Sequence, residues 1–226
     1  DGLTMVISPL ISLMQDQVRQ LIELDISAVV LNSSLSSDEY QDNLLSLQNG
    51  DIKLLFLAPE TALQPNILSL LKSIHVACIA IDEAHCISQW GYDFRPPYLQ
   101  IAEIRELLPK VPVLALTATA TPKVVEDIQE KLEFKKKNVI RKSFARENLS
   151  YMVLKEDDLK GRMLRILSKT PGSAIIYVRN RRRTQEIARF LQTQNISATF
   201  YHPGLSLAER QTRQNDWIDD NTRVIV

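Results

Sequence analysis

The 226-residue sequence contains only two cysteines, Cys78 and Cys86. Two thiols cannot form the disulfide framework of a small secreted domain, and their spacing matches no zinc-binding pattern. We therefore expect reduced cysteines and no zinc site within this chain. A reducing compartment predicts an intracellular protein, in the cytoplasm or nucleoid of a bacterium or in the nucleus of a eukaryote.

The sequence also lacks long apolar runs. No stretch approaches the roughly 20 apolar residues that span a bilayer, and no signal peptide is recognisable, so we expect no membrane partner. The first and last apolar segments, residues 3–7 and 223–226, have the character of core strands. Domains rarely begin within a sheet, and we therefore expect this chain to be an internal piece of a longer protein.

An excess of charge of one sign is absent as well, because 27 basic residues balance 27 acidic ones. No global basic field indicates a polyanionic partner, although a local groove could still bind one. Glycine is equally scarce. The six glycines include no Gly-x-x-x-x-Gly-Lys-Ser/Thr loop, so the sequence has no P-loop to hold the phosphates of a nucleotide.

What the sequence does contain is a regular alternation of strands and helices. Apolar, branched runs predict strands at 3–7, 29–31, 52–57, 76–81, 113–116, 174–178, 198–201 and 224–226. Helical periodicity or capping residues predict helices at 10–21, 38–48, 67–71, 99–108, from 121 onward, 184–194 and 207–217. Such alternation predicts an α/β fold with parallel sheets and right-handed crossovers.

A polar segment over residues 141–160 interrupts this pattern, since periodicity weakens and charge rises there. We predict a first domain at residues 1–142, an inter-domain segment at 143–157 and the N-terminal part of a second domain at 158–226. Both domains are expected to be incomplete.

Two carboxylates, Asp82 and Glu83, directly follow the buried strand at 76–81. Ligands of open α/β sheets bind at the carboxyl ends of the strands. There, Asp82 could hold magnesium and Glu83 could deprotonate a water that attacks a phosphoryl group. Taken alone, however, the pair is equally compatible with solvated acids at the end of a strand.

The residues that follow make the pattern specific. Asp-Glu-Ala-His at 82–85, continued by Cys-Ile-Ser-Gln-Trp-Gly-Tyr-Asp-Phe-Arg-Pro-Pro-Tyr at 86–98, closely resembles the RecQ family of superfamily 2 DNA helicases. Other helicases of the superfamily share the first four residues but not the aromatic continuation. Further segments resemble that family in the expected order, at 6–18, 57–60, 114–121, 144–151, 175–178 and 201–210.

The resemblance implies two RecA-like domains, ATP and Mg²⁺ as cofactors, and single-stranded and duplex DNA as partners. RecQ-type enzymes translocate on single-stranded DNA in the 3′–5′ direction and act in recombination and repair. In the family, the phosphate-binding lysine loop lies before the position of Asp1, and the γ-phosphate-sensing arginine lies after that of Val226. We therefore expect this chain alone neither to bind ATP well nor to unwind DNA.

The resemblance also implies roles for individual residues. Asp82 matches the magnesium ligand and Glu83 the catalytic base, while His85 and Gln89 match the residues that couple nucleotide state to DNA contact. We call the adjoining segment at 86–95 the aromatic loop. Its DNA-binding residues correspond to Trp90, Phe94 and Arg95. Base stacking on an aromatic ring contributes roughly 1–3 kcal/mol and tolerates any sequence.

Several side chains have two interpretations. Trp90 is either a core anchor or a stacking surface, and the surrounding glycine, charges and prolines favour the second. Ser8 either contacts a DNA phosphate or caps a helix. Thr117 and Thr119 either relay between the domains or satisfy backbone groups, and the resemblance favours the relay.

In the second domain, residues 179–183 form the densest basic cluster. It is either a solvated helix start or a patch that tracks phosphates, and the second interpretation makes Asn180 a DNA contact. His202 is either a DNA contact or a hydrogen-bonded loop histidine.

Some positions depart from the family pattern. Tyr92 replaces a histidine that takes part in coupling, Pro97 replaces a glutamate, and Glu147 stands where proline is common. The rival hypotheses are an RNA helicase of the DEAD or DEAH type and a non-catalytic DNA-binding or annealing scaffold. The extension at 86–95 argues against the first, and the intact Asp82 and Glu83 argue against the second.

Overall fold

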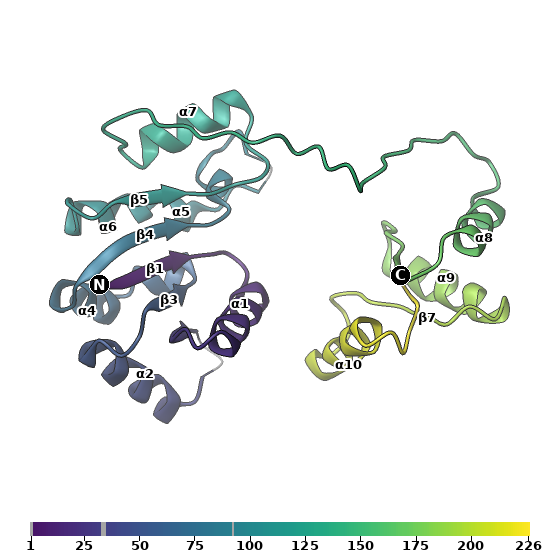
Figure 1. The fold of residues 1–226 in the computed structure, drawn as a ribbon, viewed down its shortest axis with the longest axis horizontal. Helices are drawn as coiled ribbons and strands as arrows, with labels where there is room; N and C mark the ends of the chain where they lie inside the picture. The colour runs from purple at the N-terminus through teal and green to yellow at the C-terminus, as the bar shows by residue number, and fades with distance from the viewer. Residues whose placement is uncertain (1, 33–34, 92) are drawn as a thin grey trace. The chain divides into compact units, whose positions relative to one another are not determined.

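The computed structural model describes residues 2–32, 35–91 and 93–226, and the chain divides into two compact units, residues 1–142 and 143–226 (Figure 1). The first unit is built on a five-stranded parallel sheet with the strand order β2-β3-β1-β4-β5. Its strands are β1 (Leu3–Ile7), β2 (Ala28–Leu31), β3 (Leu54–Leu57), β4 (Val76–Ile81) and β5 (Val113–Ala115). The predicted α/β class with parallel sheets is confirmed.

Apolar side chains cover both faces of this sheet, as expected for parallel strands. On one face, Met14 and Val18 of α1 (Ile11–Glu23) pack with Ala28, Val30 and Phe56. Leu10, predicted to extend the apolar stripe of this helix, is instead 48% exposed. It occupies the N-cap position, where the backbone is extended and the helical periodicity does not yet apply.

The larger core lies on the other face of the sheet, where buried residues of four longer helices, together with shorter helical segments, join the strands. The four longer helices are α2 (Ser37–Asn49), α4 (Pro65–Ser73), α6 (Ile101–Leu107) and α7 (Pro122–Lys131). As predicted from Thr121-Pro122, the Thr121 hydroxyl caps α7 by accepting a hydrogen bond from the backbone N–H of Val124. The sequence did not predict the short helices α3 (Pro59–Ala62) and α5 (Pro96–Leu99) or the 3₁₀ helix η1 (Ala84–Ile87).

The second unit has a three-stranded parallel sheet with the order β6-β8-β7. Its elements are α8 (Leu159–Lys169), β6 (Ala174–Ile175), α9 (Arg181–Thr193), β7 (Ala198–Thr199), α10 (Leu207–Ile218) and β8 (Val224–Ile225). Leu167 of α8 packs with Leu191 of α9 and with Val224 of the central strand. Helix α8, which the sequence did not predict, begins near the end of the polar segment 141–160. Asp158 caps this helix by accepting a hydrogen bond from the N–H of Gly161.

Residues 138–157 form no helix or strand and are largely exposed. None of the helices in the described ranges combines the length and apolar character that crossing a membrane requires.

Candidate active site and aromatic loop

The segments singled out by sequence in the first unit meet at one edge of the sheet. The register aligns the last residues of four neighbouring strands, Leu57, Ile7, Ile81 and Ala115. Backbone hydrogen bonds continue one step beyond, since the N–H of Ser8 donates to Leu57 and that of Asp82 donates to Ile7. Parallel pairing therefore brings together four segments that are far apart in the sequence.

Asp82 is held by hydrogen bonds from three directions. The Ser8 hydroxyl donates to Oδ2 at 3.2 Å, and the backbone N–H of Glu83 donates to Oδ1 at 2.9 Å. The buried Tyr98 hydroxyl donates to the Asp82 carbonyl oxygen at 3.0 Å. Asp82 is half-buried, and these hydrogen bonds give its carboxylate a defined orientation at the end of β4. Ser8 itself is fully buried and does not cap α1, whose N-cap is Leu10.

Glu83 occupies a left-handed backbone conformation, with φ of +46°. Non-glycine residues rarely adopt this conformation, and such strain concentrates at functional sites. The turn directs the carboxylate of Glu83 back to His85, whose Nδ1 lies 3.1 Å from Glu83 Oε2, and leaves the glutamate side chain 36% exposed. The acid can therefore be reached from solvent while its orientation is restrained.

His85 joins the acidic pair to the segment after β5. Its Nδ1 lies 3.0 Å from Thr117 Oγ1 as well as within reach of Glu83. A carboxylate only accepts hydrogen bonds, so we assign the proton to Nδ1, where it is shared between the glutamate and the threonine. The Thr117 hydroxyl in turn accepts from the N–H of Thr119 at 3.2 Å.

Trp90 is exposed over 65% of its surface, so it does not anchor the core. Its backbone N–H donates to the Ser88 hydroxyl at 3.2 Å, and Ser88 is fully buried. The next residue must be glycine, because a Cβ at Gly91 would lie 2.3 Å from the backbone oxygen of His85. The loop therefore turns tightly against η1 and presents the indole to solvent.

Arg95 fixes the far side of this loop. Its guanidinium donates to Asp93 at 2.9 Å and to the carbonyl oxygen of Pro9 at 3.2 Å, and its backbone N–H donates to Cys86. Phe94 is half-buried, whereas Gln89 is exposed. Pro97 lies in the first turn of α5, where the missing N–H of proline is tolerated. The predicted effect of Tyr92 concerns a position outside the described residues.

The predicted residues of the second unit have local partners. Asn180 is the N-cap of α9, and its side chain accepts from the N–H of Arg183 at 3.1 Å. The neighbouring arginines form the exposed first turn of that helix, and Arg182 pairs with Glu186. His202 accepts at Nδ1 from the N–H of Gly204, and its ring stacks with Phe200.

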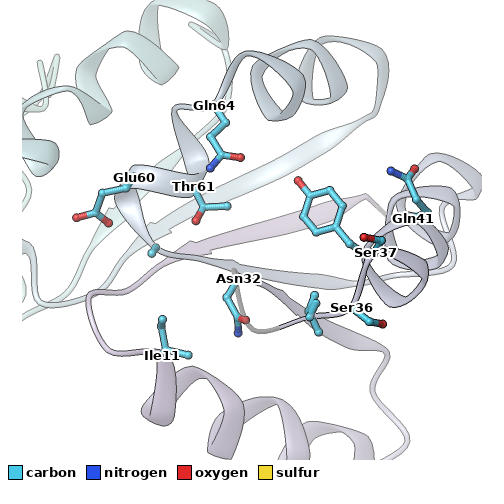
Figure 2. A pocket seen from close by; sticks show the side chains of 11 residues that line it. Ile11, Asn32, Ser36, Ser37, Gln41, Glu60, Thr61 and Gln64 are labelled. Atoms are coloured by element: carbon cyan, nitrogen blue, oxygen red, sulfur yellow. The ribbon is translucent and has the colours of Figure 1, made fainter.

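A cavity of about 460 Å³ opens at the same sheet edge in the first unit. In Figure 2, Glu60, Thr61 and Gln64 lie across it from Ser36 and Ser37, with Asn32 between them. These residues follow β2 and β3, whereas Asp82 and Glu83 follow β4 and do not line the cavity. The cavity is therefore separate from the acidic pair, and it is lined in part by Ala58 and Glu60 of the segment 57–60 that resembles the RecQ family.

Among the described residues, no three histidine, cysteine, aspartate or glutamate side chains cluster so that they could hold a metal ion. Mg²⁺ commonly takes only one or two protein carboxylates and completes its shell with water and phosphate oxygens. The oriented carboxylate of Asp82 fits that requirement.

ATP-dependent DNA helicases RecQ of Pasteurella multocida and Bacillus subtilis are each 40% identical to the whole chain. RecQ of Haemophilus influenzae is 41% identical, and the chain spans only 36–39% of the length of these three relatives.

Among solved structures, a variant of S. cerevisiae Dbp5 bound to Gle1 covers all of this chain, and the chain covers 56% of it. The TM-score is 0.70 at 18% identity, which supports the RecA-like fold. The resemblance to RecQ helicases is thus confirmed over the full chain. Residues 1–128 match the family model of the DEAD/DEAH box helicases, and the chain belongs to that family.

Proposed function

We propose that this chain is part of the motor of a RecQ-type DNA helicase. The enzyme would couple ATP hydrolysis to 3′–5′ movement on single-stranded DNA and to unwinding of duplex DNA in recombination and repair. The observation that carries the proposal is a set of contacts that runs from Asp82 and Glu83 to His85, and from the His85 backbone through Ser88 to Trp90. The relatives named as ATP-dependent DNA helicases support the same function.

For a helicase of this family, the cofactors are ATP and, as a rule, Mg²⁺. Asp82 would hold the ion, directly or through water, while Ser8 keeps the carboxylate oriented. Bound Mg²⁺ neutralises charge on the phosphates during phosphoryl transfer. Glu83 would orient the attacking water and accept its proton, and its partial exposure leaves room for that water.

For DNA, Trp90 would offer a stacking surface that does not distinguish one base from another. Phe94 would complete the apolar part of the loop. Arg95 already pairs with Asp93 and donates to the Pro9 carbonyl oxygen after β1. It would therefore support the loop while adding positive charge near the bound DNA. His85 and Gln89 would link this loop to the state of the nucleotide.

In the second unit, Asn180 and His202 would contact the DNA backbone only after giving up or sharing the local hydrogen bonds that they now make. The exposed arginines next to Asn180 would supply charge for phosphate binding. The mechanical cycle would be closure of the two domains on ATP and release after hydrolysis.

The test is ATP hydrolysis by the full-length protein with and without oligonucleotides. We expect single-stranded DNA to stimulate hydrolysis more than RNA of the same sequence. Glu83→Gln should lower the rate about 10²–10⁴-fold, the usual contribution of a general base. Glu23→Gln, which changes an exposed glutamate at the end of α1, should leave the rate unchanged.

Two results would redirect the proposal. Stronger stimulation by RNA would favour an RNA helicase of the DEAD or DEAH type. DNA binding without any hydrolysis would favour a non-catalytic scaffold.

A further inference from the structure

Lys123, in the first turn of α7, lies directly over the indole of Trp90. Its Nζ is 3.2 Å from the centre of the ring. A lysine ammonium at this distance from the face of an indole is attracted by the ring quadrupole. The contact joins two segments that are far apart in the sequence, the aromatic loop and the helix that follows β5.

The lysine stands on a firmly held element. Thr121 caps α7, and buried Val124 and Ile128 anchor the helix in the main core. Helix α7 also packs against η1, from which the aromatic loop leaves. The Trp90 side chain, by contrast, is largely surrounded by solvent. Lys123 is therefore placed to restrict the orientation of an indole that has few other contacts.

Both partners remain available to a ligand. Trp90 keeps 65% of its surface exposed even though Lys123 lies over one face of the ring. Lys123 makes no ion pair with any residue that the structure describes, so its charge is not neutralised by a carboxylate. A nucleobase can stack on the open face while the ammonium stays on the other.

We propose that Lys123 is a positioning residue for nucleic-acid binding. It holds the Trp90 indole so that a base of single-stranded DNA stacks on the open face. This inference rests on the proposed function, in which Trp90 contacts DNA. It adds a residue that no motif in the sequence marks. It also gives the helix after β5 a role in binding the DNA strand.

The test measures binding of a fluorescein-labelled oligo-dT to the full-length protein by fluorescence anisotropy at fixed salt. Lys123→Met keeps most of the length of the side chain but removes its charge, and should weaken binding about 2–5-fold, the size of an exposed cation–π contact. Lys123→Arg should restore most of the affinity, because guanidinium also binds an aromatic face. Lys110→Met, at an exposed lysine between α6 and β5, is the matched control and should change nothing.

A double-mutant cycle separates positioning from a direct phosphate contact. In a Trp90→Leu background, Lys123→Met should cause no further loss. An equal loss in both backgrounds would overturn the inference, since the lysine would then act on DNA without the indole. Unchanged or tighter binding by Lys123→Met would overturn it as well.

The contact itself has a spectroscopic readout. The chain has two tryptophans, so Trp217→Phe leaves Trp90 as the only indole emitter. In that background and without DNA, Lys123→Met should shift or brighten the emission, and an unchanged spectrum would contradict the contact. If the unaltered full-length protein fails to bind the oligonucleotide, the proposed function fails and the inference with it. If it binds and Lys123→Met has no effect, only the inference fails.

Discussion

His85 and Thr117 are joined by a 3.0 Å contact between Nδ1 and Oγ1, although 32 positions separate them in the sequence. His85 lies in η1 after β4, and Thr117 follows β5. Because β4 and β5 are adjacent parallel strands, the segments that leave their carboxyl ends lie side by side. The residue that contacts Glu83 is thereby linked to the segment that leads into α7.

Thr117→Val tests this link with a change that nearly preserves shape. Removing the hydroxyl leaves His85 with Glu83 as its polar neighbour, so basal ATP hydrolysis by the full-length protein should persist. Stimulation by single-stranded DNA should fall about 2–10-fold, the scale of one hydrogen bond. The measurement is the ratio of rates with and without DNA. Full stimulation in the variant would show that the contact carries no coupling.

Tyr98→Phe should destabilise the first unit by about 1–3 kcal/mol, because the carbonyl oxygen of Asp82 loses a buried donor. The free energy of unfolding can be followed in urea through Trp90 emission in a Trp217→Phe background. Tyr177→Phe is the control, since Tyr177 is 89% exposed and its hydroxyl should matter little. Equal stability of the Tyr98 variant and the parent would mean that water replaces the hydroxyl.

Gly91→Ala should disrupt the aromatic loop, because the added methyl group would approach the His85 carbonyl to 2.3 Å. The backbone must move, and the emission of Trp90 should change. Gly50→Ala is a useful comparison. Gly50 ends α2 with φ of +79° and has open space around it, so its cost comes from backbone conformation, about 1 kcal/mol. It should leave Trp90 emission unaltered, and a similar change in both variants would refute the steric argument.

Burial raises the pKa of the Cys86 thiol to about 11. The folded chain keeps this thiol protonated, whereas in the unfolded chain it ionises near pH 9. Its contribution to stability is thus complete below about pH 9 and is lost as the pH rises toward 11. Burial raises the pKa of Tyr98 too, which acts in the same direction.

The measurement for Cys86 is the free energy of unfolding of the first unit between pH 8 and 11, for the parent and for Cys86→Ala. We expect the parent to lose more stability over this range than the variant, so the two curves should converge. Curves that stay parallel would show that the thiol does not govern this loss.

The sequence was sufficient to predict the strands and most helices of the first unit, because parallel strands buried on both faces are continuously apolar. The segment 76–81 and its carboxylate end are the clearest example. The ends of helices were less predictable, because the position of the capping residue determines where the first turn begins. Leu10 has the right spacing for the apolar face of α1 but precedes its first turn.

Contacts between distant segments had no local signal. The Tyr98 hydroxyl reaches Asp82, and Lys123 reaches Trp90, only because crossovers bring separate strand ends together. Motifs identified which segments carry chemistry, but they did not show that Ser8 donates to Asp82. Nor did they show that Asn180 is engaged in capping α9.

The left-handed turn at Glu83 has a consequence for the timing of the proposed cycle. It brings the glutamate to His85, so the contacts from Asp82 to Trp90 all lie inside one compact unit. Hinged domains close in microseconds to milliseconds, more slowly than an exposed side chain such as Trp90 changes rotamer. A signal carried by contacts within this unit would not have to wait for the domains to close, so the grip on the DNA strand could adjust within each step.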